Sequence, residues 1–201
     1  MRRDLTQHRH MPAAKTTRPN PIAPASRSKG ALHLSAIDVV AHNPIDVLAR
    51  LALAEGFDRE RIGDHDLHIG LRGHWCDHHI SLSHKEGEGL LQLYLVFETR
   101  IPKERAPCIR DLISKLNARL ALGHFDYWDA DQTVVYRQAH CLSGQARMNT
   151  AQAMTLIAAA REAAEKAYPA LQYVLWAGKA SDDAIEQALL DIEVQGRADD
   201  T

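Results

Sequence analysis

The chain has 201 residues, 45% of them hydrophobic and 25% charged, so it can form one folded domain with a sizeable core. Its three cysteines, Cys76, Cys108 and Cys141, are odd in number and lack C-x-x-C spacing, which argues against a disulfide framework and favours a reducing cytoplasm. No apolar run approaches the roughly 20 residues that span a bilayer, and Arg2 and Arg3 are not followed by the apolar stretch of a secretory signal. We therefore expect a cytoplasmic protein that does not enter membranes.

The net charge of -2 is unevenly distributed along the chain. Residues 1–42 hold seven basic and two acidic side chains, a net of +5, whereas residues 43–201 hold 17 basic and 24 acidic side chains, a net of -7. Because residues 1–35 are rich in Pro, Ala, Ser, Thr and Arg, they cannot bury enough apolar surface to offset the entropy lost on ordering. We predict a disordered tail over residues 1–42, although a basic tail could also bind nucleic acid or a membrane surface, or fold back on the acidic body. Met11 is an alternative start that would exclude Met1–His10.

The folded domain is expected to begin at Asn43-Pro44, since Asn is a favoured N-cap and Pro a favoured first helical residue. This helix carries an apolar face and ends at Gly56. The hydrophobic period then changes to two, and turn signals such as Gly63-Asp64 separate the apolar runs. Together with a short polar strand at residues 58–62, these runs predict four antiparallel strands with short connections, the other three at residues 66–72, 75–83 and 90–98.

A second helix is predicted between Ile101-Pro102 and Gly123, because residues 108–120 carry apolar side chains at helical spacing. Gly123 ends the helix and a strand follows, which makes residues 108–128 the expected centre of the core. Two strands come next, residues 124–129 and 133–142, separated by the Asp129-Ala130-Asp131 turn.

The last third of the chain is predicted to be helical. Asn149 is predicted to cap a long helix, with Gln152 as its capping-box partner. Pro169 is expected to kink or end this helix, and residues 171–176 to resume it. Ser181 caps a final short helix. The order α-β-β-β-β-α-β-β-α-α predicts an α+β domain over residues 43–195, followed by a disordered C-terminus over 196–201. Its helices should pack on one face of an antiparallel sheet of five to six strands.

Histidines are concentrated in one part of the chain. Six of the twelve lie between positions 65 and 84: His65, His68, His74, His78, His79 and His84. On a strand, His74, Cys76 and His78 would share a face, and these are ligand types for zinc. That face continues into Ile80 and Leu82, so the core face of a strand is the favoured interpretation, with a metal site or an enzyme as the alternative.

Other catalytic motifs are incomplete or absent from the sequence. His84-Lys85-Glu86 and Pro107-Cys108 partly match the zinc deaminase pattern, but Asp111 stands where the second cysteine is needed. The acids Asp126, Asp129 and Asp131 could do acid–base work or hold a cation, although turn chemistry explains two of them. The aromatic residues, predicted as core or interface, are Tyr127, Trp128, Tyr168, Tyr173 and Trp176. We assign no catalytic, cofactor-binding or metal-binding residues, and no cofactor.

Several short motifs together resemble the YbjN family over about residues 43–195. They are Asn43-Pro44-Ile45, Trp75 before His79-Ile80-Ser81-Leu82-Ser83, Asn117 with Leu122-Gly123-His124-Phe125-Asp126, and Leu175-Trp176-Ala177-Gly178-Lys179. The resemblance implies a fold similar to type III secretion chaperones and a role as a bacterial sensory transduction regulator rather than an enzyme. It supplies no active-site residues, and the matched positions look structural.

We therefore expect a non-enzymatic, protein-binding regulatory domain with a protein partner, and a homodimer as a further expectation. Secretion chaperones present sheet and helix surfaces to an extended partner segment, and the apolar strand at 90–97 suggests pairing of that kind here. One alternative is a metal-binding protein or enzyme that uses the His65–His84 cluster. The other alternative is a nucleic-acid-linked regulator that acts through the basic tail. The tail is the candidate because the folded domain is acidic and should bind nucleic acid poorly.

Overall fold

The computed structural model describes residues 43–144 and 146–199, all of which belong to one compact unit. The predictions for the tail at 1–42, including Met1–His10, lie outside the described residues. None of the helices within the described ranges is long and apolar enough to cross a bilayer.

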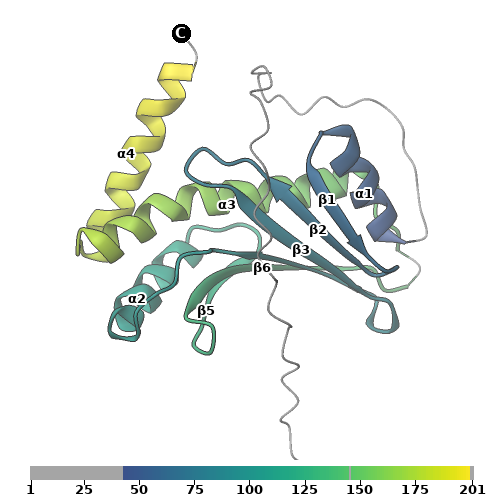
Figure 1. The fold of residues 1–201 in the computed structure, drawn as a ribbon, viewed down its shortest axis with the longest axis horizontal. Coiled ribbons are helices and arrows are strands. Elements are labelled where there is room, and N and C mark those ends of the chain that lie inside the picture. Colours follow the sequence, from purple (N-terminus) through teal and green to yellow (C-terminus); the bar gives the residue numbers. More distant parts are fainter. Residues whose placement is uncertain (1–42, 145, 200–201) are drawn as a thin grey trace, which may run out of the picture. The chain divides into compact units, whose positions relative to one another are not determined.

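Six antiparallel strands form a single sheet in the order β1-β2-β3-β4-β6-β5 (Figure 1). The predicted element order and α+β class are confirmed, with two short 3-10 turns added between elements. The elements are α1 (Pro44–Ala54), β1 (Asp58–Ile62), β2 (Asp66–Leu71), β3 (His78–Lys85), η1 (Glu86–Glu88), β4 (Leu90–Val96), η2 (Lys103–Arg105), α2 (Ala106–Asn117), β5 (His124–Trp128), β6 (Thr133–Cys141), α3 (Thr150–Trp176) and α4 (Ser181–Asp199).

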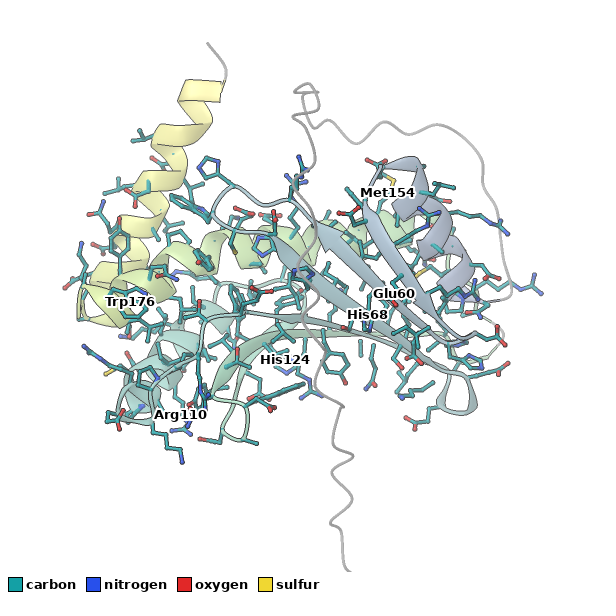
Figure 2. All side chains as sticks on the ribbon, viewed as in Figure 1. Glu60, His68, Arg110, His124, Met154 and Trp176 are labelled. Atoms are coloured by element: carbon teal, nitrogen blue, oxygen red, sulfur yellow. The ribbon has the colours of Figure 1, made fainter. Side chains whose placement is uncertain are left out.

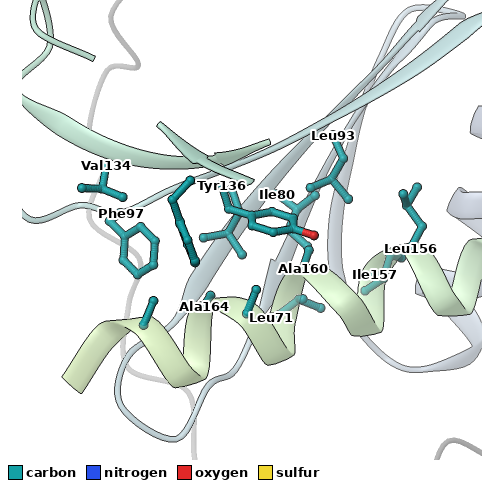
Figure 3. Close-up of a cluster of buried hydrophobic side chains, with 14 of the residues drawn as sticks. Leu71, Ile80, Leu93, Phe97, Val134, Tyr136, Leu156, Ile157, Ala160 and Ala164 are labelled. Carbon is teal, nitrogen blue, oxygen red and sulfur yellow. The ribbon is translucent and has the colours of Figure 1, made fainter. Parts of the chain in front are cut away.

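Alternate side chains leave the sheet on opposite faces (Figure 2), and one of these faces is packed against helices. Leucines and isoleucines of β2, β3 and β4 join residues of α1, α2 and α3 in one hydrophobic cluster. Figure 3 shows α3 running beneath the sheet, with Ala160 and Ala164 facing Tyr136 and Leu93. Because alanine is small, α3 can approach the sheet closely. Each fully buried Leu or Ile side chain in this core contributes about 1.5–3 kcal/mol to the stability of the fold.

The second helix is shorter than predicted. α2 ends at Asn117 instead of Gly123, because the Asn117 side chain turns toward β5. Its Oδ1 accepts from the Phe125 N–H at 2.7 Å, and its Nδ2 donates to the Phe125 carbonyl at 3.0 Å. These two hydrogen bonds join the end of α2 to the start of β5, and Gly123, at φ +67°, lies in the connection between them.

Pro169 does not end α3, so the predicted separate resumption at residues 171–176 was wrong. α3 is one helix from Thr150 to Trp176 with Pro169 buried inside it. A proline in a helix interior removes a hydrogen bond and costs about 3 kcal/mol. Buried neighbours on both sides, Ala167, Ala170 and Leu171, pack into the main core, and this packing offsets the cost.

Two boundaries also differ from the sequence prediction. β3 begins at His78, since residues 74–76 form a bend. The last helix is long rather than short: α4 starts at Ser181 and runs to Asp199, beyond the expected domain end at 195 and into the segment assigned to a disordered C-terminus. Ile185 and Ala188 of α4 are buried, whereas Leu189 is exposed.

Candidate functional site

The six histidines between positions 65 and 84 are dispersed over the domain. His68 and His79 lie on the helix-free face of the sheet, and His78 lies on the helix-packed face. His65 and His84 meet at one end of the sheet, with ring centroids 5.8 Å apart, while His74 is in an exposed loop. Among residues 43–144 and 146–199 no group of three or more His, Cys, Asp or Glu side chains is arranged to hold a metal ion.

His78 forms a buried polar cluster with residues of α3 and the loop before β3. Only 2% of His78 is exposed, and its Nε2 donates to Glu165 Oε1 at 2.7 Å. The same Oε1 accepts from the His74 backbone N–H at 2.9 Å. A Cβ at Gly73 would lie 2.2 Å from this oxygen, so only glycine fits there. The cluster fixes the 72–77 loop against α3.

Cys76 completes an arrangement that superficially resembles a thiol nucleophile with its base. Its Sγ lies 3.8 Å from His78 Nδ1. Burial, with a further contribution from the Glu165 carboxylate, raises the pKa of the Cys76 thiol to about 11. At neutral pH Cys76 is therefore a protonated thiol, which is the unreactive form. The geometry favours a structural role for this cluster.

Burial alone would raise the pKa of Glu165, but the hydrogen bonds from His78 and from the His74 N–H hold this pKa below its ordinary value. Glu165 is therefore ionised at neutral pH, and its charge is stabilised by two donors.

A pocket of about 450 Å³ opens where β3, η1 and the segment before α3 meet. Its walls carry the opposite charges of Glu86 and Arg147, and apolar contacts come from Leu142 and Met148. His84 lines it with a buried Nδ1 that has no hydrogen-bond partner. Burial, followed by the neighbouring His65, lowers the pKa of His84, so its ring is neutral at pH 7. The pocket is open to solvent on a surface of mixed charge, and its lining side chains do not converge as a set of catalytic groups.

The acids of the β5–β6 hairpin are held apart by different partners. Asp129 forms an ion pair with Arg110 of α2, whereas Asp126 lies 3.6 Å from Arg137 of β6. Asp131 is exposed in the turn. The three carboxylates are thus not gathered into one site, and turn and ion-pair roles explain their placement.

The face of the sheet opposite the helices is the largest functional candidate, and we call it the open face. The register aligns one residue from every strand across this face, and Figure 2 shows three of them, Glu60, His68 and His124, in a line across the sheet. The full row is Glu60, His68, Ser81, Tyr94, Arg137 and His124. Within the described part of the chain, the helices that contribute to the core cluster, α1, α2, α3 and α4, pack with the side chains of the other face.

An aromatic pair lies in this face near β5. The rings of Tyr94 and Trp128 are 6.0 Å apart, and the Arg137 guanidinium lies 5.4 Å from the Tyr94 ring centroid. Val135, on the same face, is 0% exposed although it is outside the main core cluster, so its neighbours on the open face cover it. Tyr127 points the other way and is buried in the core.

The open face carries acidic charge. Five acids, Asp58, Glu60, Asp66, Glu98 and Asp126, share it with two bases, Lys85 and Arg137, which leaves a net charge of -3. Glu98 lies 3.4 Å from His79, and Asp126 is paired with Arg137. Asp58, Glu60 and Asp66 make no ion pair with any residue that the structure describes, so the β1–β2 side of the face is the unneutralised side.

Comparison with known proteins assigns the chain to a family. The family model described as "YbjN: Putative bacterial sensory transduction regulator" matches residues 44–173, well over half of the chain. The chain belongs to the YbjN family. The crystal structure of YbjN, "a putative transcription regulator from E. coli", matches this YbjN-family chain with a TM-score of 0.46 and 12% sequence identity, over 62% of this chain and 88% of that chain. No curated protein matches it significantly.

Several residues of the motifs that carry the YbjN resemblance have structural roles in this chain. Asn43 caps α1, Asn117 ties α2 to β5, and Gly123 allows the close approach of the Tyr136 hydroxyl, which would lie 2.3 Å from a Cβ at this position. Gly178, at φ +64°, follows α3, and the Lys179 ammonium lies 4.7 Å from the Tyr173 ring centroid. These five positions are therefore structural, whereas the motif residues His79, Ser81, His124 and Asp126 lie on the open face.

Sequence reasoning did not single out Tyr94 and Arg137, and it grouped Trp128 with Tyr127. The signal was present in the period-two alternation, which puts Tyr94 opposite to Leu93 and Leu95, and Trp128 opposite to Tyr127. In this YbjN-family chain the polar side of each strand, more than the histidine cluster, forms the continuous candidate surface.

Proposed function

We propose that this protein is a non-enzymatic regulatory domain that acts by binding another protein on its open face. The observation that carries the proposal is the Tyr94–Trp128 pair with Arg137, on the β4–β6–β5 side of a sheet face that the core helices leave uncovered. Tyr, Trp and Arg are the residues most often responsible for binding energy at protein interfaces. The description of the YbjN family as a regulator agrees with such a role.

Strand pairing at the apolar strand near 90–97 is not available, because β4 lies inside the sheet between β3 and β6. A partner strand could pair only at the edges, which are β1 and β5. β1 is exposed at all five positions, so it is the better edge for an added strand.

The size of the open face bounds the strength of the complex. Six strands span about 24 Å and six residues along a strand about 20 Å, so the face covers about 500 Å² in projection. A stable complex buries about 800 Å² on each partner. We therefore expect a transient complex, or one that also uses the β1 edge.

Affinity capture with three forms of the full chain tests this proposal. Tyr94→Ala/Trp128→Ala removes the aromatic pair, and Trp176→Ala is the control because Trp176 is 74% exposed at the end of α3. A partner that wild type and control retain, and that the double variant loses while remaining folded by circular dichroism, supports the proposal. A partner retained equally by all three forms, or no reproducible partner, contradicts it.

Self-association stays a separate proposal. Apolar side chains are exposed at the end of α3 and on α4: Trp176, Leu189, Leu190 and Val194. Light scattering of the full chain measures the mass directly, and a monomer at all concentrations would exclude a homodimer. The nucleic-acid alternative concerns residues 1–42, which lie outside the described residues, and equal DNA binding with and without that segment would exclude it.

A further inference from the structure

We propose that the open face binds an extended, arginine-rich segment of a partner protein. This inference rests on the proposed function and names the chemistry of the partner. It is carried by the unpaired acids Asp58, Glu60 and Asp66 at one side of the face and by the aromatic pair with Asp126 at the other.

The acids on β1 and β2 repel one another. Asp58 and Glu60 are two residues apart on one strand and point to the same face, and Asp66 lies diagonally from Glu60 on β2. No described side chain neutralises them, so a bound cation relieves their repulsion. The same net charge of -3 opposes the binding of nucleic acid, whose phosphates are negative.

The aromatic side of the face is already suited to a guanidinium group. Arg137 lies over the Tyr94 ring at 5.4 Å, the geometry of a cation–π contact. The neighbouring Trp128, half-buried and with its ring 6.0 Å from that of Tyr94, offers a second ring. Asp126 lies two residues before Trp128 on β5 and so on the same face. An arginine of the partner can therefore stack on Trp128 and share the Asp126 carboxylate with Arg137, which lies 3.6 Å from it. An ammonium group makes such contacts less well.

The two sides of the face set the length of the segment. Asp58 and Asp126 occupy the same cross-strand row on the two outer strands, β1 and β5. Five strand spacings separate them by about 24 Å, which about seven extended residues cover. Between them the row holds Gly70, His79, Val96 and Val135, and the absence of a side chain at Gly70 leaves room there for a main chain. We therefore expect two basic clusters about seven residues apart.

Nuclear magnetic resonance titration of the isotope-labelled full chain tests the assignment. The probe is a peptide of alternating Arg and Pro, about 12 residues long and so long enough to cross the sheet. Peptides with Lys or Glu in place of Arg are the controls. We expect the Arg peptide to shift the Trp128 indole and Ser81 amide signals but not those of α4, the Lys peptide to bind more weakly, and the Glu peptide not to bind.

Two variants and a charge-matched control give the affinities. Asp58→Asn/Glu60→Gln should weaken binding of the Arg peptide roughly 3- to 10-fold at low salt, and Trp128→Ala roughly 2- to 5-fold. Glu104→Gln/Glu186→Gln removes the same charge from exposed positions of η2 and α4 and should leave the affinity within about 2-fold.

Equal binding of the Glu peptide, or equal affinity of the open-face variants and the control, would overturn the inference. Residues 1–42 carry a net charge of +5 and are the competing occupant. Binding that appears only after their deletion would also overturn the assignment to a partner, and would assign the face to the chain's own basic segment. If the peptides fail while Tyr94→Ala/Trp128→Ala still loses a captured partner, the proposed function stands and only the partner's chemistry is wrong.

Discussion

Removing Glu165 should destabilise the domain more than removing any exposed acid of α3. Its Oε1 accepts two hydrogen bonds, from His78 Nε2 at 2.7 Å and from the His74 N–H at 2.9 Å. Hydrogen bonds to a charged group contribute roughly 1.5–3 kcal/mol, and an unpaired buried donor costs roughly 1–3 kcal/mol. Because His78 is almost fully buried, Glu165→Ala should lower the free energy of unfolding by about 3 kcal/mol.

Urea denaturation at pH 7, followed by circular dichroism, measures this change. Glu165→Gln keeps an acceptor without the charge and should cost about half as much, or about 1.5 kcal/mol. Glu162→Gln is the control, since Glu162 forms only an exposed ion pair with Lys166 and should cost at most about 0.5 kcal/mol. If Glu165→Ala lies within about 0.5 kcal/mol of wild type, the account of this cluster is refuted.

The pH dependence gives a second test of Glu165. Its folded-state pKa is held below the ordinary value of 4.5, so its contribution to stability is present above pH 4.5 and is lost as the pH falls through the folded-state pKa. The stability difference between wild type and Glu165→Gln should therefore be constant near neutrality and shrink below about pH 4.5. A difference that grows on acidification would contradict the sign of this argument.

Three further predictions concern single positions. Gly123→Ala should lower the free energy of unfolding by about 2–4 kcal/mol, because φ is +67° and the new Cβ meets the Tyr136 hydroxyl. Gly144 has a similar φ but lies in open space, so Gly144→Ala should cost only about 1 kcal/mol. Thermal unfolding measures both changes. Asn117→Ala removes both hydrogen bonds to Phe125 and should cost about 1–3 kcal/mol, with loss of amide protection at the start of β5 in hydrogen exchange. Burial raises the pKa of Cys76 to about 11, whereas hydrogen bonds from Ser143 lower the pKa of exposed Cys141. In iodoacetamide labelling at pH 8, Cys76 should therefore react on the order of 10- to 100-fold more slowly than Cys141. Equal labelling rates would contradict this order.

Local signals in the sequence predicted most of the fold. The Asn43 cap with Pro44, and the capping box of Asn149 with Gln152, depend on residues within one turn of each other, and both are confirmed. All six strands were predicted, those at 66–72 and 75–83 from period-two alternation, because side-chain direction in a strand depends only on position.

The features that sequence reasoning missed depend on residues far apart in the chain. Pro169 stays inside α3 because of packing against other elements, and α2 ends early because Asn117 bonds to a different strand. His78 meets Glu165 across 87 positions, so no local pattern could indicate that pair. The open face could be predicted strand by strand, but its rows depend on the pairing of β4 with β6 across an intervening helix and strand.

Photo-crosslinking in living cells tests the central claim, that the open face is the recognition surface, most directly. A photoreactive amino acid at Ser81 would lie in the middle of the open face, and the same group at Thr155 would lie on the exposed side of α3. We predict a discrete crosslinked protein from position 81 that is absent from position 155 and is reduced by Trp128→Ala. Crosslinks from position 155 alone, or equal crosslinks from both positions, would contradict the claim.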